Sequence, residues 1–504
     1  RGTIYGVYSY LEQLGVLWLT SEVTVMPKMT ILPMKEGEHL LKMPTSVRYM
    51  AWNFPSSELW RVRNRLNGMN AALPEEYGGY YPEASGGDCH YLRQLVPFEL
   101  CQKKHPDWFA IGKDGKPSPG DSRWGANYCT TNPEFRAFVV EAVRKRLNET
   151  GAKEIWIGQS DGLSAGCFCP RCSAERERFL PKGVTFQNDN RNRGGEFDPT
   201  AIKTDNIPWA INNIAFGNAI AKEIAKTHPD VTLLTLAYAY TVDAPPVGPK
   251  PAENLIVYLT GPFGNGVCCS FHGYRQGEFK ILNDWVKLGS RMRLYTYAAS
   301  NYGFWYPFPN LIGHAQDIQN LYRDGVKSFF DQGALGGIGS GLVELRAWLS
   351  AKMMRAPETP VREAIQTFCR AYYGAGGDAV YDYIVKYDEY TRKHGIHGDH
   401  GWGNPNAWRK WCNAETISMG INCRKRALEA VQGDSLLTKR IERAFMEVDW
   451  AAMMISLADE VTVHDGQLVF WLPGQAESGA AAARRFYELM TENRFDRLAE
   501  PAFF

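Results

Sequence analysis

Two periods of apolar residues alternate along most of the chain. Short apolar runs, typical of buried strands, are separated by segments in which apolar residues recur every three or four positions, as on one helix face. The predicted strands are residues 46–54, 155–158, 232–240, 255–259, 293–298 and 325–332. The predicted helices are residues 60–70, 133–147, 211–225, 279–288, 312–324 and 342–354. This alternation indicates a parallel α/β domain, and its length suits a (β/α)8 TIM barrel.

The two ends of the chain follow different patterns. Residues 1–45 read as a helix ended by Gly15 and two short strands, typical of a truncated small α/β domain. Beyond residue 360 the pattern is almost wholly helical, with helices predicted at residues 363–372, 379–392, 413–429, 438–458 and 480–492. We therefore predict three parts: a small α/β remnant over 1–45, a catalytic barrel over 46–355 and a helical C-terminal domain over 356–504.

Composition narrows the possible partners. The 56 basic and 55 acidic residues balance, which argues against a nucleic-acid partner. No run of about 18 apolar residues occurs, so no membrane span is expected. The 15 Trp, 25 Tyr and 24 Phe residues fit a large core, and they also fit stacking platforms for the apolar faces of sugar rings.

Carboxylates follow two of the predicted strands. Asp161 ends the run Ile155-Trp-Ile-Gly-Gln-Ser-Asp, and Asp331 ends Phe329-Phe-Asp. Parallel barrels carry catalytic groups at the carboxyl ends of their strands. A cap or an Asx turn explains Asp161 equally well. Two carboxylates across a barrel mouth are the minimum for glycoside hydrolysis, one as acid and the other as base or nucleophile.

Several further side chains are candidates for substrate binding. Arg48 can hold a carboxylate through two hydrogen bonds or pair with an acidic neighbour. The aromatic loop 301–309 is expected to be exposed. A lone histidine is more often structural than functional. Glu344 lies inside a predicted helix, where a solvated or capping role is favoured. The full candidate set is Arg48, Trp52, His90, Tyr238, His272, Trp305, Gln332 and Glu344.

A cluster of cysteines follows Asp161. Cys167, Cys169 and Cys172 have C-x-C-x2-C spacing, which occurs in metal sites. A fourth ligand could come from Cys129, Cys268, Cys269 or a histidine. No ligand motif of a catalytic zinc site and no glycine-rich phosphate loop is present. Packed thiols or a disulfide are therefore favoured over a structural metal, and we expect no metal and no cofactor.

Five segments together resemble a bacterial barrel family, domain of unknown function 4838, which is related to the α-glucuronidases and similar in layout to the β-hexosaminidases. They are Arg1-Gly-Thr-Ile-Tyr-Gly-Val-Tyr-Ser-Tyr-Leu-Glu12, His105-Pro-Asp-Trp-Phe109, Ser160-Asp-Gly162 with the cysteines behind it, Pro307-Phe-Pro-Asn310 and Phe330-Asp-Gln-Gly333. The resemblance runs over nearly the whole chain. It implies an acid after the fourth strand, matching Asp161, and a base from a late strand, matching Asp331. Ala298 stands where family members often carry an aspartate.

From the residues and the resemblance together we predict an exo-acting glycoside hydrolase that removes a terminal acidic or amino sugar from a complex glycan. Asp161 would be the general acid and Asp331 the base or nucleophile. The alternatives are a non-catalytic glycan-binding barrel protein and a metal-dependent polysaccharide hydrolase or lyase. The resemblance implies a periplasmic or extracellular location. The expected partner is a glycan or oligosaccharide, and homo-oligomers are possible.

Overall fold

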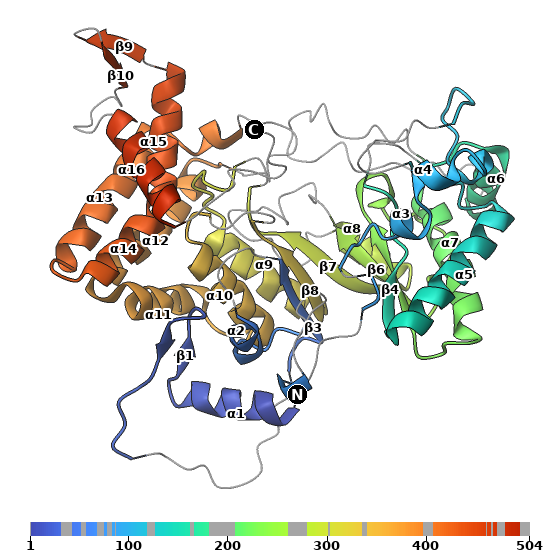
Figure 1. Cartoon of the computed structure of the whole chain (residues 1–504), viewed down its shortest axis with the longest axis horizontal. Coiled ribbons are helices and arrows are strands. Elements are labelled where there is room, and N and C mark those ends of the chain that lie inside the picture. Colours follow the sequence, from blue (N-terminus) through green and yellow to red (C-terminus); the bar gives the residue numbers. More distant parts are fainter. Residues whose placement is uncertain are drawn as a thin grey trace. The chain divides into compact units, whose positions relative to one another are not determined.

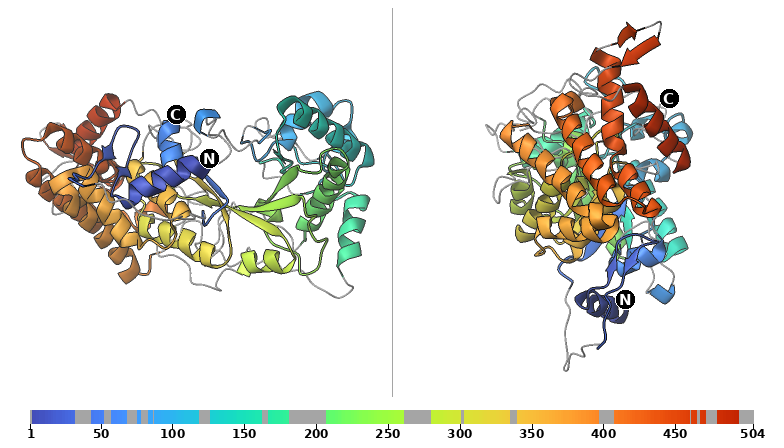
Figure 2. Two further views of the ribbon diagram at one scale, coloured as in Figure 1. Left: turned by 90° about the horizontal axis from the view of Figure 1, so that it is seen from below. Right: turned by 90° about the vertical axis from the view of Figure 1, so that its left-hand side faces the viewer.

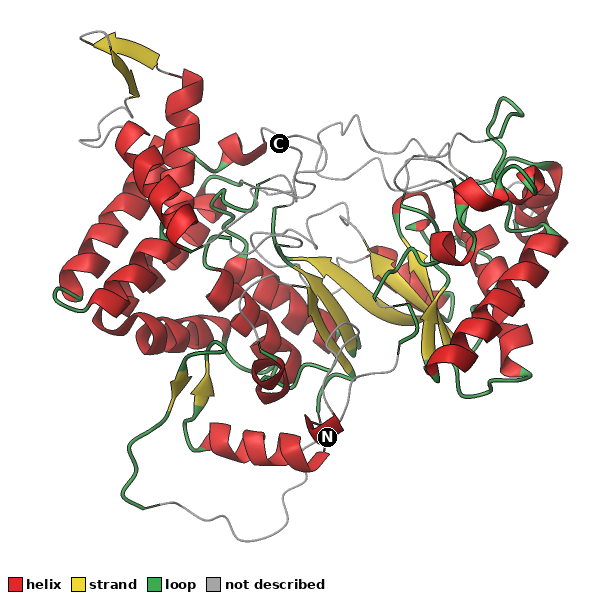
Figure 3. Cartoon of the chain, in the orientation of Figure 1, coloured by secondary structure: helices red, strands yellow, loops and turns green. Residues whose placement is uncertain are grey.

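The structure is a computed structural model of a mixed α/β protein with many helices (Figures 1 and 3). It describes residues 2–31, 43–51, 57–67, 75–77, 83–85, 87–117, 126–161, 166–180, 207–260, 280–300, 303–334, 340–396, 407–459, 461–464, 467–470 and 479–493. None of the helices in these ranges is both long and apolar enough to span a membrane.

Six parallel strands form a curled half-barrel sheet in the order β3-β8-β7-β6-β5-β4. The strands are β3 (Val47–Ala51), β4 (Glu154–Trp156), β5 (Thr232–Ala237), β6 (Leu255–Thr260), β7 (Arg291–Tyr297) and β8 (Ser328–Gln332). Each matches a predicted strand, so the prediction of a parallel α/β sheet is confirmed. In the described ranges between β3 and β4 only a single bridge, Glu83 beside Glu154, adds to the sheet. The complete eight-stranded barrel therefore stays a prediction.

The chain divides into two compact units. The first comprises Arg1–Gly79, Asn265–Gln276 and Thr296–Phe504, and the second comprises Tyr80–Gly264 and Gly277–Tyr295. The second unit is thus made mainly of the middle of the chain, between the two large segments of the first. The predicted boundaries at residues 45 and 355 stay a prediction.

Helices cover one face of the strands in the second unit. The longest helices of this unit are α5 (Pro133–Thr150) and α7 (Ala210–Ala225). Its shorter helices are α3 (Leu92–Leu95), α4 (Phe98–Cys101), α6 (Pro170–Phe179) and α8 (Lys280–Lys287). The predicted start of α5 is confirmed, because the Asn132 side chain accepts a hydrogen bond from Phe135 N and Pro133 occupies the first turn. Asn213 on α7 donates to the Leu236 carbonyl, which fastens that helix to β5.

The opposite face of these strands holds a buried ion pair. Arg293 Nη1 lies 2.7 Å from Glu154 Oε2, and a second guanidinium nitrogen contacts the other carboxylate oxygen. The two side chains are 8% and 2% exposed. Arg293 also donates to the Tyr258 hydroxyl at 3.2 Å, and the Tyr258 ring lies 4.4 Å from that of Trp156. Alternation along the strands places all four side chains on the same face of the sheet.

In the first unit, the N-terminal residues form α1 (Gly2–Gln13), β1 (Leu17–Trp18) and β2 (Thr24–Val25), with β1 and β2 antiparallel. Gly15 follows the helix with a φ of +94°, as its predicted stop role requires. Glu12 on α1 forms ion pairs with Arg65, Lys352 and Arg355. Arg65 lies two residues beyond α2 (Glu58–Arg63), and Lys352 and Arg355 lie on α10 (Val343–Arg355), so these ion pairs join α1 to both segments. Helix α9 (Leu311–Arg323) precedes β8.

The C-terminal region is helical, as predicted, with one departure. Its helices, coloured orange and red in Figure 2, are α11 (Val361–Tyr373), α12 (Gly377–Lys393), α13 (Ala414–Ala430), α14 (Ser435–Ala444), α15 (Met446–Asp459) and α16 (Gly479–Glu492). The prediction of a single helix over 438–458 is wrong, because the helix is interrupted at the buried Phe445, which separates α14 from α15. An antiparallel pair, β9 (Val461–His464) and β10 (Gln467–Phe470), was not predicted.

Candidate functional site

Asp161 lies just beyond β4 in the second unit, where the strand-end rule predicts functional groups. Ile157 extends the strand pairing by one bond to the Leu234 carbonyl, and the Ser160 hydroxyl donates to the Ala126 carbonyl at 3.1 Å. The Asp161 side chain is 31% exposed, and its Oδ1 lies 3.7 Å from His90 Nε2. Asp161 therefore lies beside the His90 imidazole, which can carry a positive charge, and its carboxylate is also accessible to solvent.

His90 is brought to this strand end by close backbone packing. A Cβ at Gly158 would lie 2.1 Å from the Cys89 carbonyl oxygen, so glycine permits the approach of the segment that carries His90. The segment itself is shaped by Asp88, whose carboxylate accepts from the His90 backbone N–H at 2.9 Å. Sequence spacing alone gives no hint of this contact across the fold.

The His90 ring has a fixed orientation. Its Nδ1 lies 2.5 Å from the Gln159 carbonyl oxygen, and because a carbonyl only accepts, Nδ1 carries the proton. Nε2 then faces Asp161. The ring also lies 5.9 Å from that of Tyr238, and the Gln159 amide donates to the Tyr238 carbonyl at 2.9 Å. The structure thus brings three predicted residues, His90, Asp161 and Tyr238, into one cluster, and it adds Gln159, which was not predicted.

Electrostatics favour a protonated His90. Burial opposes the charge, but Cys89, Asp161 and the Gln159 carbonyl outweigh it and raise the pKa of His90 to about 10. An imidazolium therefore stands beside Asp161 at neutral pH. Such a cation can bind an anionic group of a ligand.

The raised pKa of His90 predicts a pH-dependent stability. The contribution of His90 to the free energy of unfolding is complete below about pH 6.5 and is lost as the pH rises toward 10. Within that window we expect the free energy of unfolding to fall by about 1.4 kcal/mol per pH unit from this group. The measurement is urea unfolding across pH 6–10 for wild type, His90→Gln and His228→Gln. His90→Gln should be flatter, whereas His228→Gln, altered at a half-buried histidine beside the Asn148 side chain, should follow wild type. Equal slopes in all three would contradict the assignment.

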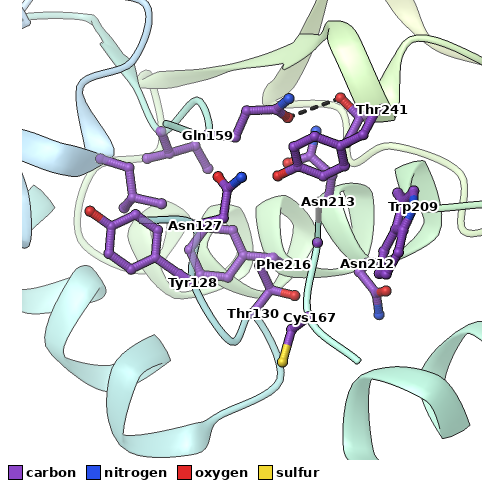
Figure 4. A pocket seen from close by; sticks show the side chains of 14 residues that line it. Asn127, Tyr128, Thr130, Gln159, Cys167, Trp209, Asn212, Asn213, Phe216 and Thr241 are labelled. Atoms are coloured by element: carbon purple, nitrogen blue, oxygen red, sulfur yellow. Dashed lines mark hydrogen bonds between the residues drawn. The ribbon is translucent and has the colours of Figure 1, made fainter. Parts of the chain in front are cut away.

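A small cavity adjoins the cluster. It has a volume of about 30 Å³ and includes Asn127, Trp209, Phe216 and Tyr240 in its lining (Figure 4). Gln159 reaches its edge, where Thr241 donates to Gln159 Oε1 at 2.9 Å. That volume is enough for a water molecule or two but not for a sugar. The cavity is therefore too small to be a binding site for a sugar.

Asp331, the other predicted carboxylate, lies in the first unit and is fully buried, with a side chain 0% exposed. Thr296 Oγ1 donates to its Oδ1 at 2.9 Å, and His314 Nε2 on α9 lies 2.9 Å from the same oxygen. Its side chain points toward the helix that precedes β8. The neighbouring Phe330 points to the other face, where its ring stacks on that of Tyr49 at 4.4 Å. Asp331 does not reach solvent in this structure.

Three other candidates in the first unit are buried by structural contacts. Arg48 donates to the backbone carbonyls of Thr45 and Arg65. Glu344 lies 2.7 Å from Arg443, an ion pair between α10 and α14. The expected exposure of Trp305 is wrong: its indole is 0% exposed and packs edge-on against Phe486.

The remaining candidates add little to the site. Gln332 ends β8 and is 4% exposed. Trp52 and His272 lie outside the described residues. The substrate-binding roles of all these residues stay predictions.

The cysteine triplet gains a fourth member in the structure. Cys129, Cys167, Cys169 and Cys172 are all buried, and their sulfur atoms lie within 4.8 Å of one another. The four are free thiols, so the disulfide considered from the spacing is not formed among them. Of the fourth ligands considered, Cys129 is the one that the fold brings to the triplet.

Comparison with known proteins adds a family but no activity. No curated protein matches the chain. The model of one family, described as a domain of unknown function (DUF4838), matches residues 18–385, which include all six strands of the sheet, the His90–Asp161 cluster and the four cysteines. The resemblance seen in the sequence motifs is confirmed by this match, and the chain belongs to the DUF4838 family.

Proposed function

We propose that the protein is an exo-acting glycoside hydrolase that removes a terminal acidic or amino sugar from a glycan. The observation that carries the proposal is the His90–Asp161 pair at the carboxyl end of β4, with the Asp161 carboxylate open to solvent. In the proposed reaction Asp161 gives a proton to the oxygen of the departing group. The Tyr238 ring beside His90 offers a surface for the sugar.

Of the two sugar classes, the charge on His90 favours the acidic one. A uronate carboxylate at His90 would compete with Asp161 for the imidazolium. An Asp161 released from that ion pair can then carry the proton that the glycosidic oxygen requires. In this scheme the substrate's own charge prepares the acid, so a neutral sugar of the same size would be a poor substrate.

Asp331 is the proposed base or nucleophile, and its burial favours a second candidate function. A carboxyl group enclosed by Thr296 and His314 can reach an anomeric carbon only after these contacts open. A protein with one accessible carboxylate could bind the glycan without cleaving it. Non-catalytic glycan binding is therefore the second candidate. A catalytic metal at the four clustered thiols is disfavoured, because all four are buried and no histidine or carboxylate belongs to the cluster.

The test is a panel of aryl uronides, N-acetylhexosaminides and neutral hexosides, together with natural oligosaccharides, offered to the full chain. We expect cleavage of a uronide with kcat/KM at least about 10-fold above that of the matching neutral glycoside, since one charge-assisted hydrogen bond contributes about 1.5–3 kcal/mol. His90→Gln should remove that preference and His228→Gln should keep it. Glycan binding by calorimetry without product would establish the second candidate. If the chain neither binds nor cleaves any member of the panel, both candidate functions are refuted.

A further inference from the structure

Four cysteine sulfurs in the second unit come together from two segments of the chain. Cys129 precedes α5, Cys167 and Cys169 precede α6, and Cys172 lies in the first turn of α6. The Sγ atom of Cys129 lies 3.6 Å from that of Cys169 and 3.8 Å from that of Cys172. All four side chains are buried in a small cluster with Ala110 and Ile111.

These distances match a tetrahedral metal site. Zinc binds thiolate sulfur at about 2.3 Å, so the edge of a zinc tetrahedron of four sulfurs is about 3.8 Å. A disulfide would require about 2.05 Å. The Cys129 sulfur is therefore separated from the sulfurs of Cys169 and Cys172 by about the edge of such a tetrahedron, and all four sulfurs lie within 4.8 Å of one another.

Backbone groups around the sulfurs suit thiolates. Ile111 N–H donates to Cys167 Sγ at 3.3 Å. Cys169 N–H donates to Cys167 Sγ and Cys172 N–H donates to Cys169 Sγ, each at 3.5 Å. The last bond caps α6, whose first residue is Pro170. Three N–H groups aimed at sulfur stabilise negative charge on it, as ligands of a cation require.

The charges of nearby side chains complete the balance. Four thiolates and one divalent cation carry a net charge of −2. The Arg171 guanidinium interacts electrostatically with Cys129 and Cys169, and the buried Arg176 donates to the Cys167 carbonyl at 3.1 Å. Two guanidinium groups thus offset the charge that a tetrathiolate centre would have.

From this geometry we propose that Cys129, Cys167, Cys169 and Cys172 form a closed structural zinc centre. Zinc binding would release the four thiol protons to solvent. With all four positions filled by protein sulfur the metal has no open site, so it holds the fold and takes no part in chemistry. It would join the start of α5 to the start of α6. Residues 126–129 are also bonded to the strand end through Ser160, so the centre would steady the segment that carries Asp161.

The test is metal analysis of the full chain purified without chelator. We expect about one zinc ion per chain, and at least about a 10-fold loss of zinc in Cys129→Ser and Cys172→Ser, because removing one thiolate opens the site. Cys101→Ser is the matched control, since Cys101 is a partly exposed cysteine on α4 of the same unit; it should retain its zinc.

A second measurement does not depend on the variants folding. Cobalt exchanged into the wild-type chain should give the intense visible absorption and the sulfur-to-metal charge-transfer bands of a tetrahedral thiolate site. The proposal would be overturned by a native chain that lacks metal and whose four thiols react freely with a thiol reagent. Two disulfides among the four, found by mass spectrometry, would overturn it equally.

Discussion

Replacing Asp161 by asparagine should lower kcat on the best glycoside by about 10²- to 10⁴-fold, the usual contribution of a general acid. The amide keeps the shape of the side chain and can still contact His90, but it has no proton of suitable acidity to give. KM should not rise, because the loss of rate falls on the transition state and the neutral amide no longer competes with the substrate carboxylate for the His90 imidazolium. The loss should be smallest on aryl glycosides with the most acidic leaving group, which needs least protonation. Steady-state kinetics on a graded series of aryl glycosides measures this dependence.

Two further variants show whether a loss of activity is specific to the predicted catalytic carboxylates. Glu141→Gln makes the same chemical change at a carboxylate 70% exposed on α5, and it should match wild type. Asp331→Asn separates two roles for the buried carboxyl group. A base or nucleophile lost from an intact fold would lower kcat on every leaving group alike, whereas a structural carboxyl would lower the unfolding midpoint first. An Asp161→Asn variant with more than half the wild-type kcat on a natural glycan would exclude Asp161 as the acid.

Arg293→Met should lower the free energy of unfolding by about 3–5 kcal/mol, because it leaves the Glu154 carboxylate buried without its partner. Glu154 is 2% exposed, and both of its oxygens face the guanidinium. Methionine keeps much of the side-chain volume, so the loss reports the unpaired charge rather than a cavity. Urea unfolding followed by tryptophan fluorescence measures the change.

The same strand supplies a matched control. Arg291 begins β7, is exposed, and donates to the Glu253 carbonyl, so Arg291→Met should stay within about 0.5 kcal/mol of wild type. The double variant Glu154→Gln/Arg293→Met should recover part of the stability, since the buried charge is gone. If Arg293→Met and Arg291→Met proved equally mild, the ion pair would not be the element that stabilises this part of the sheet.

Local sequence signals were sufficient to predict the six strands of the sheet and most of the helices that connect them. Asn132 and Pro133 start α5 through bonds within a single turn, and Gly151 ends it with a φ of +64°. Such features depend on neighbours in sequence, so the residues alone reveal them. The hairpin of β9 and β10 also had a signal, the Asp465-Gly466 pair between two alternating runs, and it could have been predicted.

Other features depend on contacts between distant residues and had no local signal. The sequence indicated that Asp331 belongs to a strand, but not which face of β8 it would take; Thr296 and His314 define that face. The aromatic loop suggested exposure, yet Trp305 is covered by Phe486 on α16. Phe445 separates α14 from α15, although no glycine or proline stands there to signal the interruption. Proximity of Cys129 to the cysteine triplet likewise depends on the packing of α5 and α6 against the same helix, α7.

The order of the two units along the chain has a consequence for synthesis. β3 pairs with β8, and the hydrogen bond from Ser46 to the Lys327 carbonyl spans 281 residues. A ribosome adding about 5–20 residues per second needs roughly 15–60 s to make that stretch. Throughout this interval the second unit can fold while β3, already emerged, has an unpaired edge. Contacts of such long sequence separation also slow folding. The nascent chain therefore presents the apolar strand Val47–Ala51 to the cell before its partner exists, and it is there that chaperones would have to act.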